Sequence, residues 1–339
     1  MDKKQTYLIN KRSHKRRRDK RIRMFLSAFF LVLLAGAMYG AKLLATTQNI
    51  VGESYHEIER QEEIIVEPAK DPTSILIMGV DNNDTRQLDS TRTDAMIYLT
   101  MNPHTNKINM VSIPRDSYTE LIHNGEVVEY NRINAAYGIG KEQTAVESVE
   151  HLLQVPVHYY ATIDFDAFMD IIDALGGVEV DVPIEFTESN APGRSGAISL
   201  NKGMQTLDGE EALALARTRK IDNDVKRGER QQLIVQAIIQ KALKLNSIPR
   251  YTQAIESVSG NMKTNMRMND MIAIMKSGMT SSYSISSHTF DWYDYDHYGA
   301  SMIKLEENSL EKMRETFKYS LEETQPSTHQ KRPAIDTSQ

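Results

Sequence analysis

The sequence predicts an α/β domain whose mixed central β-sheet is flanked by helices on both faces and preceded by a single N-terminal transmembrane helix. Three observations support this fold class. Short apolar runs of strand length alternate with segments of helical period along residues 73–321. One uncharged segment near the N-terminus is long enough to cross a bilayer. The 339 residues are 25% charged and 40% apolar, and no internal repeat or composition break requires a second globular domain.

The N-terminal part divides into a basic cytoplasmic tail, residues 1–23, and a transmembrane signal-anchor, residues 24–45. Residues 24–41 contain no charge, and about 20 apolar residues at ~1.5 Å each cross a bilayer core of roughly 30 Å. A cleaved signal peptide is the alternative. Its apolar region is normally shorter, and no small-residue cleavage site follows this segment, so the sequence favours an uncleaved anchor.

Charge predicts the orientation of the chain. Residues 1–23 carry 11 Lys and Arg, which gives this tail +9, whereas the remaining residues sum to −15. Basic residues beside a span are retained on the cytoplasmic side, so we expect a single-pass type II protein of the cell membrane with an extracellular domain. A basic arm that binds nucleic acid is the less favoured alternative, and no nucleic-acid partner is expected. The absence of cysteine excludes disulfides, thiolate metal sites and cysteine nucleophiles.

The external part begins with an acidic stalk, residues 46–72, and continues as a folded domain, residues 73–321. The apolar run 74–80, between Pro72 and Asp81, is typical of a buried central strand. Together with five further segments it predicts a sheet of six strands. The other strands are expected at 96–101, 107–113, 126–130, 156–163 and 178–182.

Helical spacing of apolar residues predicts the elements that cover the sheet. The segment 166–175 is the best delimited, because Asp164 precedes it as an N-cap and Gly176-Gly177 ends it. A strand is expected near 283–293, and the tail 322–339 is rich in Thr, Ser, Gln and Pro and is expected to be disordered. The other helices are predicted at 142–153, 208–216, 229–245, 250–258, 270–277 and 309–321.

Arginine and aspartate recur at the ends of the predicted elements. Asp81 ends the first strand, Arg92 and Asp94 precede the second, and Arg115 follows the third. Neighbouring strands would bring these four side chains to one rim of the sheet, where ligand sites are common. A second group follows the predicted helix 208–216 and comprises Arg217, Arg219, Asp222, Asp224, Arg227, Arg230 and Gln231.

These residue types indicate a site for a phosphate ester. Guanidinium groups bind phosphoryl oxygens through paired hydrogen bonds and keep their charge, so converging arginines suit a diphosphate. Carboxylates beside them would repel the same anion unless a cation intervened, and Mg²⁺ binds one or two carboxylates together with substrate phosphates. Each signal has a simpler alternative. Asp222, Asp224, Arg227 and Arg230 are equally consistent with a solvated charge network at a helix start.

The motifs together resemble the LytR-CpsA-Psr family of cell-wall ligases. The resemblance covers residues 74 to about 245 closely and continues loosely to about 320. The most specific part is Arg-x-Arg followed by Asp-x-Asp-x-x-Arg-x-x-Arg-Gln-Gln within 217–232. The matching stretches are ILIMGVD (75–81), RTDAMIYLT (92–100), INMVSIPRDS (108–117), RINAAYGIG (132–140), TIDFDAFMDIIDALGGVEVDV (162–182) and LDGEEALALARTRKIDNDVKRGERQQ (207–232).

This resemblance implies a membrane-anchored phosphotransferase. Such an enzyme moves an anionic glycopolymer, such as wall teichoic acid, from a polyprenyl diphosphate carrier to the C6 hydroxyl of N-acetylmuramic acid in peptidoglycan, and a phosphodiester forms. By motif position, Mg²⁺ would be held by Asp81 and Asp94. The diphosphate would be contacted by Arg92, Arg115, Arg217, Arg219, Arg227 and Gln231. The residues implied in catalysis are Asp81, Arg115, Arg217, Arg219 and Asp224.

Several alternatives stay open at the level of sequence. The base that takes the acceptor proton is Asp81 or Asp224, unless metal activation suffices without a protein base. Attack by water instead of acceptor would make the protein a polyprenyl diphosphate hydrolase, and a non-catalytic envelope regulator is a third reading. The resemblance also implies a tunnel for the lipid chain, although each candidate equally suits an ordinary core. These candidates are Phe165, Phe168, Ile171, Ile172, Leu233 and Ile238.

Overall fold

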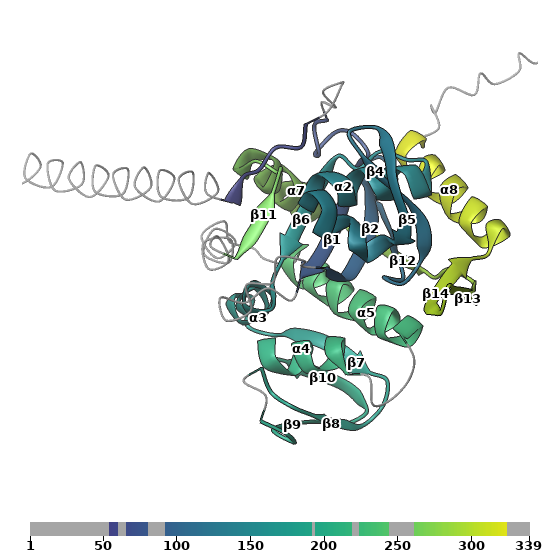
Figure 1. The fold of residues 1–339 in the computed structure, drawn as a ribbon. Helices are drawn as coiled ribbons and strands as arrows, with labels where there is room; N and C mark the ends of the chain where they lie inside the picture. The colour runs from purple at the N-terminus through teal and green to yellow at the C-terminus, as the bar shows by residue number, and fades with distance from the viewer. Residues whose placement is uncertain are drawn as a thin grey trace, which may run out of the picture. The chain divides into compact units, whose positions relative to one another are not determined.

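The computed structural model describes residues 54–59, 66–80, 92–191, 194–218, 224–243 and 261–323 (Figure 1). The predicted tail 1–23, the predicted span 24–45 and the predicted helix 250–258 lie outside these ranges, as do Asp81 and Arg219. Within the described ranges, none of the helices combines the length and the apolar character that a membrane crossing requires.

A mixed sheet forms the centre of the domain, and the described residues contribute six strands to it in the order β11-β6-β1-β2-β3-β12. β1 runs antiparallel to β2 and parallel to β6, while β3 runs parallel to β12. The strands are β1 (Thr73–Val80), β2 (Thr93–Asn102), β3 (Lys107–Ser112), β6 (Tyr159–Ile163), β11 (Met262–Thr264) and β12 (Ser284–His288). The mixed sheet and the four predicted strands at 74–80, 96–101, 107–113 and 156–163 are confirmed.

Two strands predicted for this sheet belong elsewhere. The segment 126–130 forms β5 (Glu126–Arg132), which pairs with β4 (Tyr118–His123) in a separate hairpin. The segment 178–182 forms β7 (Val178–Val182), which pairs with β10 (Gly203–Leu207). Their places are taken by β11, a strand of only three residues, and by the serine-rich β12. The single strand predicted near 283–293 is two strands in the structure: β12 pairs with β3, and β13 (Trp292–His297) begins after residues 289–291 and pairs with β14 (Ala300–Leu305).

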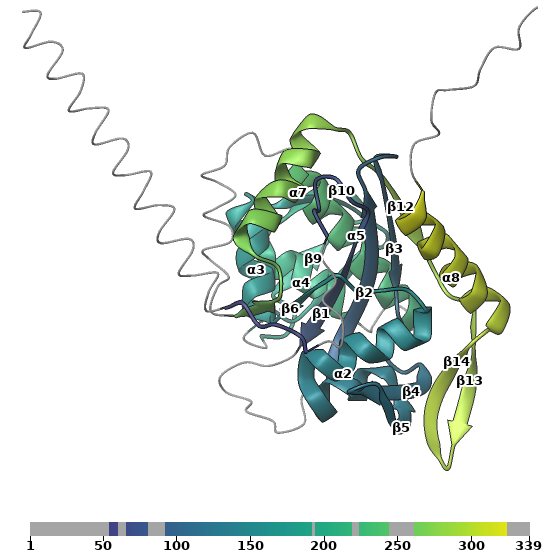
Figure 2. The same ribbon diagram turned by 90° about the horizontal axis from the view of Figure 1, so that it is seen from above.

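The two faces of the sheet pack against different helices, because alternate residues of each strand point to opposite sides. On one face, Leu76 and Tyr98 belong to a buried cluster with residues of α2 (Ala136–Leu153) and α8 (Glu307–Glu322). The rings of Tyr98 and Phe317 meet edge to face with centroids 4.9 Å apart. On the other face, Leu99 and Met110 pack with Val235 of α5 (Asp224–Leu243) and with α7 (Met268–Thr280). Figure 2 shows α2 and α7 on opposite sides of the sheet.

A second, smaller core lies on the far side of α5 from the sheet (Figure 1). It joins α3 (Phe165–Ala174), β7, β10 and α4 (Gly209–Arg217) to the short hairpin β8 (Phe186–Glu188) and β9 (Ile198–Leu200). The Asp164 carboxylate accepts a hydrogen bond from the Ala167 amide at 2.8 Å, so the predicted N-cap of α3 is confirmed. Of the residues considered for a lipid tunnel, Ile172 is buried in this core, and Phe168 and Ile238 pack against it.

Helix limits follow local sequence closely, with two exceptions. α2 begins six residues before the predicted 142 and contains a break at Gly140-Lys141, where Lys141 has a φ of 55°. α5 begins at Asp224 instead of 229, because its first turn is polar and lacks the apolar spacing on which that prediction depended. α3, α4, α7 and α8 confirm the predicted helices at 166–175, 208–216, 270–277 and 309–321.

Part of the predicted stalk 46–72 contacts the edge of the sheet. The His56 amide donates to the Thr264 carbonyl at 2.9 Å, and the Tyr160 hydroxyl donates to the His56 carbonyl at 2.7 Å. Ile58 is buried in the same core as α2. Residues 54–59 therefore pack against the domain next to β6 and β11.

Candidate functional site

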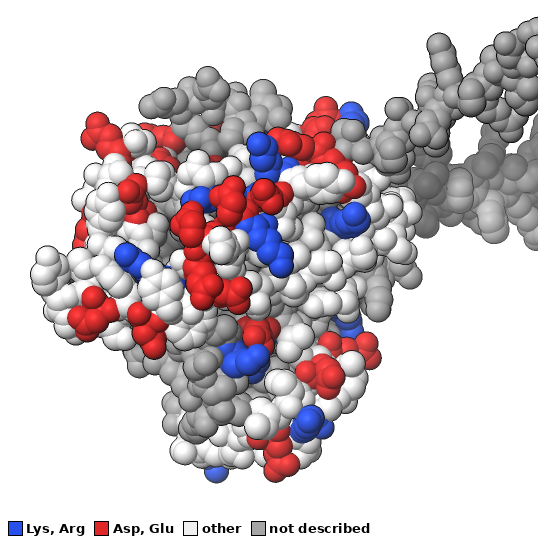
Figure 3. Space-filling view, turned by 90° about the vertical axis from the view of Figure 1, so that its right-hand side faces the viewer, with Lys and Arg blue, Asp and Glu red and all other residues white. Residues whose placement is uncertain are grey.

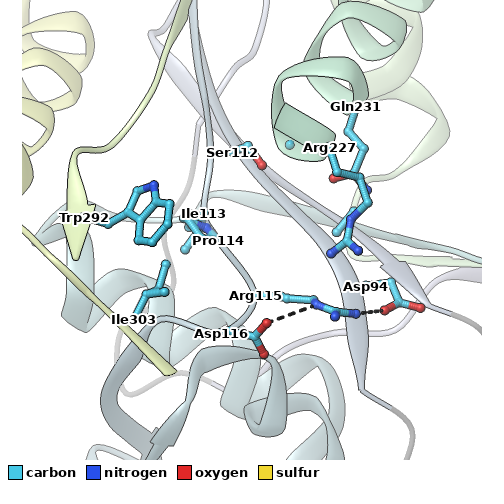
Figure 4. Close-up of a pocket in the computed structure, with 12 residues that line it drawn as sticks. Asp94, Ser112, Ile113, Pro114, Arg115, Asp116, Arg227, Gln231, Trp292 and Ile303 are labelled. Carbon is cyan, nitrogen blue, oxygen red and sulfur yellow. Dashed lines mark hydrogen bonds and ion pairs between the residues drawn. The ribbon is translucent and has the colours of Figure 1, made fainter. Parts of the chain in front are cut away.

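A pocket lies at the end of the sheet where β3 ends and β2 begins (Figure 4). Its wall is formed by Asp94 and Ala95 of β2, by residues 112–116, and by the first turns of α5. Trp292 of β13 and Ile303 of β14 close the opposite side. Of the four residues predicted for the rim, Asp94 and Arg115 line this pocket, and Arg227 and Gln231 of the second predicted group line it with them.

The turn after β3 presents Arg115 to the pocket. The Ser117 amide and hydroxyl both donate to the Pro114 carbonyl, at 3.0 and 2.7 Å, and the Asn134 amide donates to the Arg115 carbonyl at 3.2 Å. Pro114 itself restricts φ and has no amide hydrogen to satisfy. Hydrogen bonds to the Pro114 and Arg115 carbonyls therefore fix the backbone of this turn without any contribution from the Arg115 side chain.

Ion pairs then orient the Arg115 guanidinium. Arg115 Nη1 donates to Asp94 Oδ1 at 2.8 Å, and Arg115 Nε lies 3.5 Å from Asp116 Oδ2 (Figure 4). Asp116 also lies 3.3 Å from Arg132 Nε, and Arg132 Nη2 donates to the Ser301 carbonyl of β14 at 2.7 Å. The Arg115 side chain is 19% exposed and Asp94 is 40% exposed, so the pair faces solvent through the pocket mouth. Sequence reasoning did not assign Asp116 or Arg132 to the site.

The N-terminal turns of α5 supply the opposite wall. Arg227 is 6% exposed, and in Figure 4 its guanidinium points from α5 toward Arg115 and Asp94. Gly228 lets the first turns of α5 lie close to the end of β3, because a Cβ at that position would lie 2.8 Å from Ser112 Oγ. Gln232, one turn further along α5, donates to the His288 carbonyl of β12 at 3.0 Å. The helix start is therefore clamped to the ends of β3 and β12.

Arg230 is a buried arginine that connects α5 to α4. Its side chain is 2% exposed, and it donates to the Leu215 carbonyl at 3.1 Å and to the Thr218 carbonyl at 2.6 Å. These carbonyls belong to the last turn of α4, which has no further helical amides to satisfy them. The alternative of a solvated charge network is therefore wrong for Arg227 and Arg230. The spacing of Arg230, three residues after Arg227 on one helix face, was the only sequence signal of this role.

The other predicted site residues are placed differently. Arg217 ends α4, and its guanidinium carbon lies 5.7 Å from the centre of the Phe165 ring. Gln231 Nε2 lies 3.5 Å from the Ala216 carbonyl, so the end of α4 is next to the pocket wall. Arg92 is exposed immediately before β2 and is not among the residues that line the pocket. Asp224 is the first residue of α5.

One titratable group beside the pocket wall has a shifted pKa. Burial lowers the pKa of the His288 imidazole, and the nearby Lys312 ammonium lowers it further. The neutral ring stays within 3.2 Å of Asn109 Oδ1, on the strand that leads to Arg115. His288 therefore contributes a neutral polar contact on this side of the pocket.

The donor set is compatible with a divalent cation that is shared with a substrate. No group of three His, Cys, Asp or Glu side chains that could hold a metal occurs among the described residues. Mg²⁺ does not need such a group, since it binds one or two carboxylates together with phosphate oxygens and waters. Asp94 uses one oxygen toward Arg115 and is 40% exposed, which leaves this carboxylate accessible from the pocket.

The fold and the pocket define a class of protein. A mixed α/β sheet ends in a pocket that combines two arginines from separate elements, one accessible carboxylate and a glutamine amide. Such a donor set binds a phosphorylated anion and stabilises charge on its oxygens.

Comparison with known proteins shows the family. The model of the LytR_cpsA_psr family matches residues 42–319, so the chain belongs to this family. It is 32% identical to "Polyisoprenyl-teichoic acid--peptidoglycan teichoic acid transferase TagT" of Bacillus subtilis, over 92% of this chain and 99% of that protein.

Solved structures of proteins from this family are also similar to this chain. The crystal structure of Bacillus subtilis TagV is 34% identical and matches with a TM-score of 0.66 over 75% of this chain and 99% of the other. The structure of the LytR-CPS2A-psr family protein YwtF (TagT) with bound octaprenyl pyrophosphate lipid is 29% identical, with a TM-score of 0.59 over 78% of this chain and 99% of the other.

Proposed function

We propose that this protein transfers an anionic glycopolymer from a polyprenyl diphosphate carrier to the C6 hydroxyl of N-acetylmuramic acid in peptidoglycan. The observation that carries the proposal is the pocket itself, in which Arg115 and Arg227 approach one another from different elements beside Asp94. Two neighbouring guanidinium groups repel one another unless an anion or a carboxylate compensates their charge. The relatives named as teichoic acid transferases, and the lipid diphosphate bound to one of them, agree with a diphosphate as that anion.

In this proposal the arginines bind the diphosphate and stabilise the transfer. Arg115 and Arg227 contact its oxygens directly, and Gln231 donates from its amide. As the bond between the phosphorus and the bridging oxygen breaks, charge grows on the leaving polyprenyl phosphate, and fixed guanidinium groups stabilise it without reorganisation. Arg217, which ends α4, and Arg219 are assigned to the diphosphate by motif position. Arg92 is assigned to the diphosphate by motif position alone.

We assign the divalent cation to Asp81 and Asp94. Asp81 follows Val80, and Val80 pairs in the sheet with Thr93, the residue before Asp94. The two aspartates are therefore adjacent to paired positions of β1 and β2. Bound Mg²⁺ would neutralise charge on the diphosphate oxygens. The base that takes the proton of the acceptor hydroxyl is Asp81 in this proposal, and Asp224 is the alternative.

The predicted topology completes the proposal. The chain is anchored by residues 24–45 with its N-terminus in the cytoplasm, so the domain acts outside the membrane, where peptidoglycan lies. The support for this arrangement is the uncharged segment 24–41 and the basic tail before it. Hydrolysis of the carrier diphosphate is the same reaction with water as the acceptor, and a non-catalytic regulator would bind the ligand without turnover.

The test is a transfer assay with the full-length protein, a synthetic polyprenyl diphosphate glycan and peptidoglycan oligomers, with and without Mg²⁺. We expect a glycan–phosphodiester product and released polyprenyl phosphate, both dependent on Mg²⁺. Release without product would favour the hydrolase, and neither release nor product would exclude both enzymes. Arg115→Ala should abolish the product, with unchanged far-UV circular dichroism as the control for folding. A regulator would retain its cellular effect in that variant.

A further inference from the structure

The pocket has an apolar half that the proposed function does not use. Figure 4 shows Trp292 and Ile303 across the pocket from Arg227 and Gln231. A ligand that fills the whole pocket therefore meets charged groups on one side and an aromatic ring on the other. The apolar half is lined by Ile113, Pro114, Trp292 and Ile303.

The pairing of β13 with β14 determines which side chains face this half of the pocket. Asp294 pairs with Ile303, and paired residues of an antiparallel hairpin point to the same face. Trp292 precedes Asp294 by two residues on β13, so it points to that face as well. Tyr293, between them, points to the opposite face. Because Trp292 and Ile303 line the pocket, Asp294 lies on the pocket side of the hairpin.

Two polar groups on this face are available to a ligand. Asp294 is exposed, and its carboxylate has neither an ion pair nor a hydrogen bond with the residues that the structure describes. Trp292 is partly buried, and its indole N–H finds no acceptor within the described ranges. The other carboxylates of the pocket differ in this respect, because Asp94 and Asp116 are both paired with Arg115.

Hydrogen bonds fix the position of the hairpin relative to the arginines. The Ile303 amide donates to the Asp116 carbonyl at 3.1 Å, which joins β14 to the turn that carries Arg115. Arg132 of β5 donates through Nη2 to the Ser301 carbonyl of β14 at 2.7 Å. A ring that binds on the pocket side of the hairpin is therefore held next to the groups that bind the diphosphate.

The side chains on this face suit an uncharged sugar ring. The C–H groups of a pyranose carry partial positive charge and stack on the negative face of an indole, while its hydroxyls donate to a carboxylate. A prenyl chain would cover the Asp294 carboxylate with hydrocarbon, which is costly. A polyanion would be repelled by Asp294. Figure 3, which shows the side of the domain where α8, β13 and β14 lie in Figure 1, also has more acidic than basic side chains.

The direction of transfer identifies the acceptor as the source of this sugar. The attacking and leaving oxygens lie roughly in line, on opposite sides of the phosphorus. The α5 side suits the leaving polyprenyl phosphate, because two residues considered for the lipid chain, Phe168 and Ile238, pack against the core beyond that helix. The acceptor oxygen then approaches from the opposite wall, which carries Trp292.

We propose that Trp292 and Asp294 form the acceptor subsite of the pocket. The indole stacks on a pyranose ring of the acceptor glycan, and the Asp294 carboxylate accepts a hydrogen bond from a hydroxyl of that ring. The C6 oxygen forms the new bond to phosphorus as the bond to the bridging oxygen breaks, the electron pair leaves with polyprenyl phosphate, and the proton goes to Asp81. This inference rests on the proposed function, which requires a glycan acceptor.

Binding to the subsite can be measured without turnover. Trp292 is the single tryptophan of the chain, so its fluorescence reports directly on a ligand at this wall. The full-length protein is titrated with a β-1,4-linked N-acetylglucosamine hexamer, in the absence of donor and Mg²⁺. We expect a saturable change in emission, and a dissociation constant about tenfold higher for Asp294→Ala, which keeps the reporter. An unchanged emission spectrum with the hexamer would overturn the proposal.

Kinetics of transfer separate the acceptor subsite from the donor site. Trp292→Leu and Asp294→Ala should each raise the acceptor KM about tenfold and change the donor KM less than twofold. Trp292→Phe retains a ring and should stay within about threefold of wild type, which also guards against a folding defect in Trp292→Leu. Tyr293→Leu is the matched control, because Tyr293 is an aromatic residue of the same strand, is 51% exposed and points away from the pocket. It should change neither KM.

Two kinetic outcomes would contradict the proposal. A raised donor KM with an unchanged acceptor KM would place the donor on Trp292. An acceptor KM that is as sensitive to Tyr293→Leu as to Trp292→Leu would show a general effect of the hairpin.

The subsite and the proposed function fail in distinguishable ways. If the wild-type protein transfers nothing but binds the hexamer in a manner that depends on Asp294, the subsite stands and the proposed function falls. If transfer occurs with an acceptor KM that is insensitive to both substitutions, the proposed function stands and the subsite falls.

Discussion

The two arginines of the pocket are held by two different kinds of structure. Arg115 lies in a turn fixed by backbone hydrogen bonds and by partly exposed ion pairs with Asp94 and Asp116. Arg227 lies on a helix whose position depends on one buried side chain, Arg230, and on a glycine contact with β3. Ion pairs at a surface contribute little to folding, whereas a buried arginine that satisfies two carbonyls contributes much more. Damage to the helix side should therefore reduce both stability and activity, and damage to the turn side mainly activity.

The largest effect is expected for Arg230→Gln. The substitution leaves the Leu215 and Thr218 carbonyls without their donor, at about 1–3 kcal/mol for each buried group, and loosens the end of α4. We expect the free energy of unfolding to fall by about 2–4 kcal/mol and transfer to be lost. Urea denaturation of the full-length protein measures the first quantity. Lys226→Gln is the control on the same helix, because its partner Glu229 forms an exposed pair, and it should cost less than about 0.5 kcal/mol.

Gly228→Val should shift the helix without unfolding the protein. Its Cβ would lie 2.8 Å from Ser112 Oγ and 3.3 Å from Ser112 Cβ, and the two further methyl groups of valine add to this crowding, so we expect the helix to move away from β3. We expect kcat to fall by about tenfold to a hundredfold, since small misplacement of catalytic groups is costly. The double variant Gly228→Val with Ser112→Gly removes both close atoms of Ser112 and should recover most activity. A fully active Gly228→Val protein would show that the close approach is irrelevant.

On the turn side, Asp116→Asn should reduce activity with little change in stability. The substitution removes the carboxylate that lies between Arg115 and Arg132, so the guanidinium of Arg115 is less restricted. We expect a rate about three- to tenfold lower and a loss of no more than about 1 kcal/mol in unfolding free energy. A stability loss as large as that of Arg230→Gln would contradict the distinction between the two sides.

The smallest expected effect is on the loss of thermal stability at acid pH. Because burial lowers the pKa of His288, the unfolded chain takes up a proton at a higher pH than the folded protein does. The stability that the neutral ring contributes is complete above the unfolded pKa of about 6.5 and is lost as the pH falls through the folded pKa. We expect the Tm of His288→Gln to fall less between pH 8 and pH 5 than that of wild type, by about one or two degrees.

Sequence reasoning succeeded where a single segment contains the whole signal. Continuous apolar runs predicted β1 and β2, because these strands are buried on both faces, and Asp164 with Gly176 marked the ends of α3. It failed where pairing decides the structure. β11 is too short and β12 too polar to be distinguished from loop, and the partner of β5 depends on a turn at Asn124-Gly125.

The candidate site follows the same division. Motif positions identified Asp94, Arg115, Arg227 and Gln231, which lie together in the pocket. Arg230 was named in the motif, but its role was missed because its partners are backbone carbonyls of another helix. Asp116 and Arg132 were missed because only the tertiary fold brings them to each other and Arg132 to the Ser301 carbonyl.

The central claim is that two separately held arginines bind one diphosphate, and a binding cycle tests it most directly. The affinity of the full-length protein for a short-chain polyprenyl diphosphate is measured for wild type, Arg115→Gln, Arg227→Gln and the double variant. Each charge-assisted contact is worth about 1.5–3 kcal/mol, so each single variant should bind about ten- to a hundredfold more weakly. The double variant should lose less than the sum, because neighbouring contacts to one ligand are coupled. Wild-type affinity in either single variant would contradict the claim.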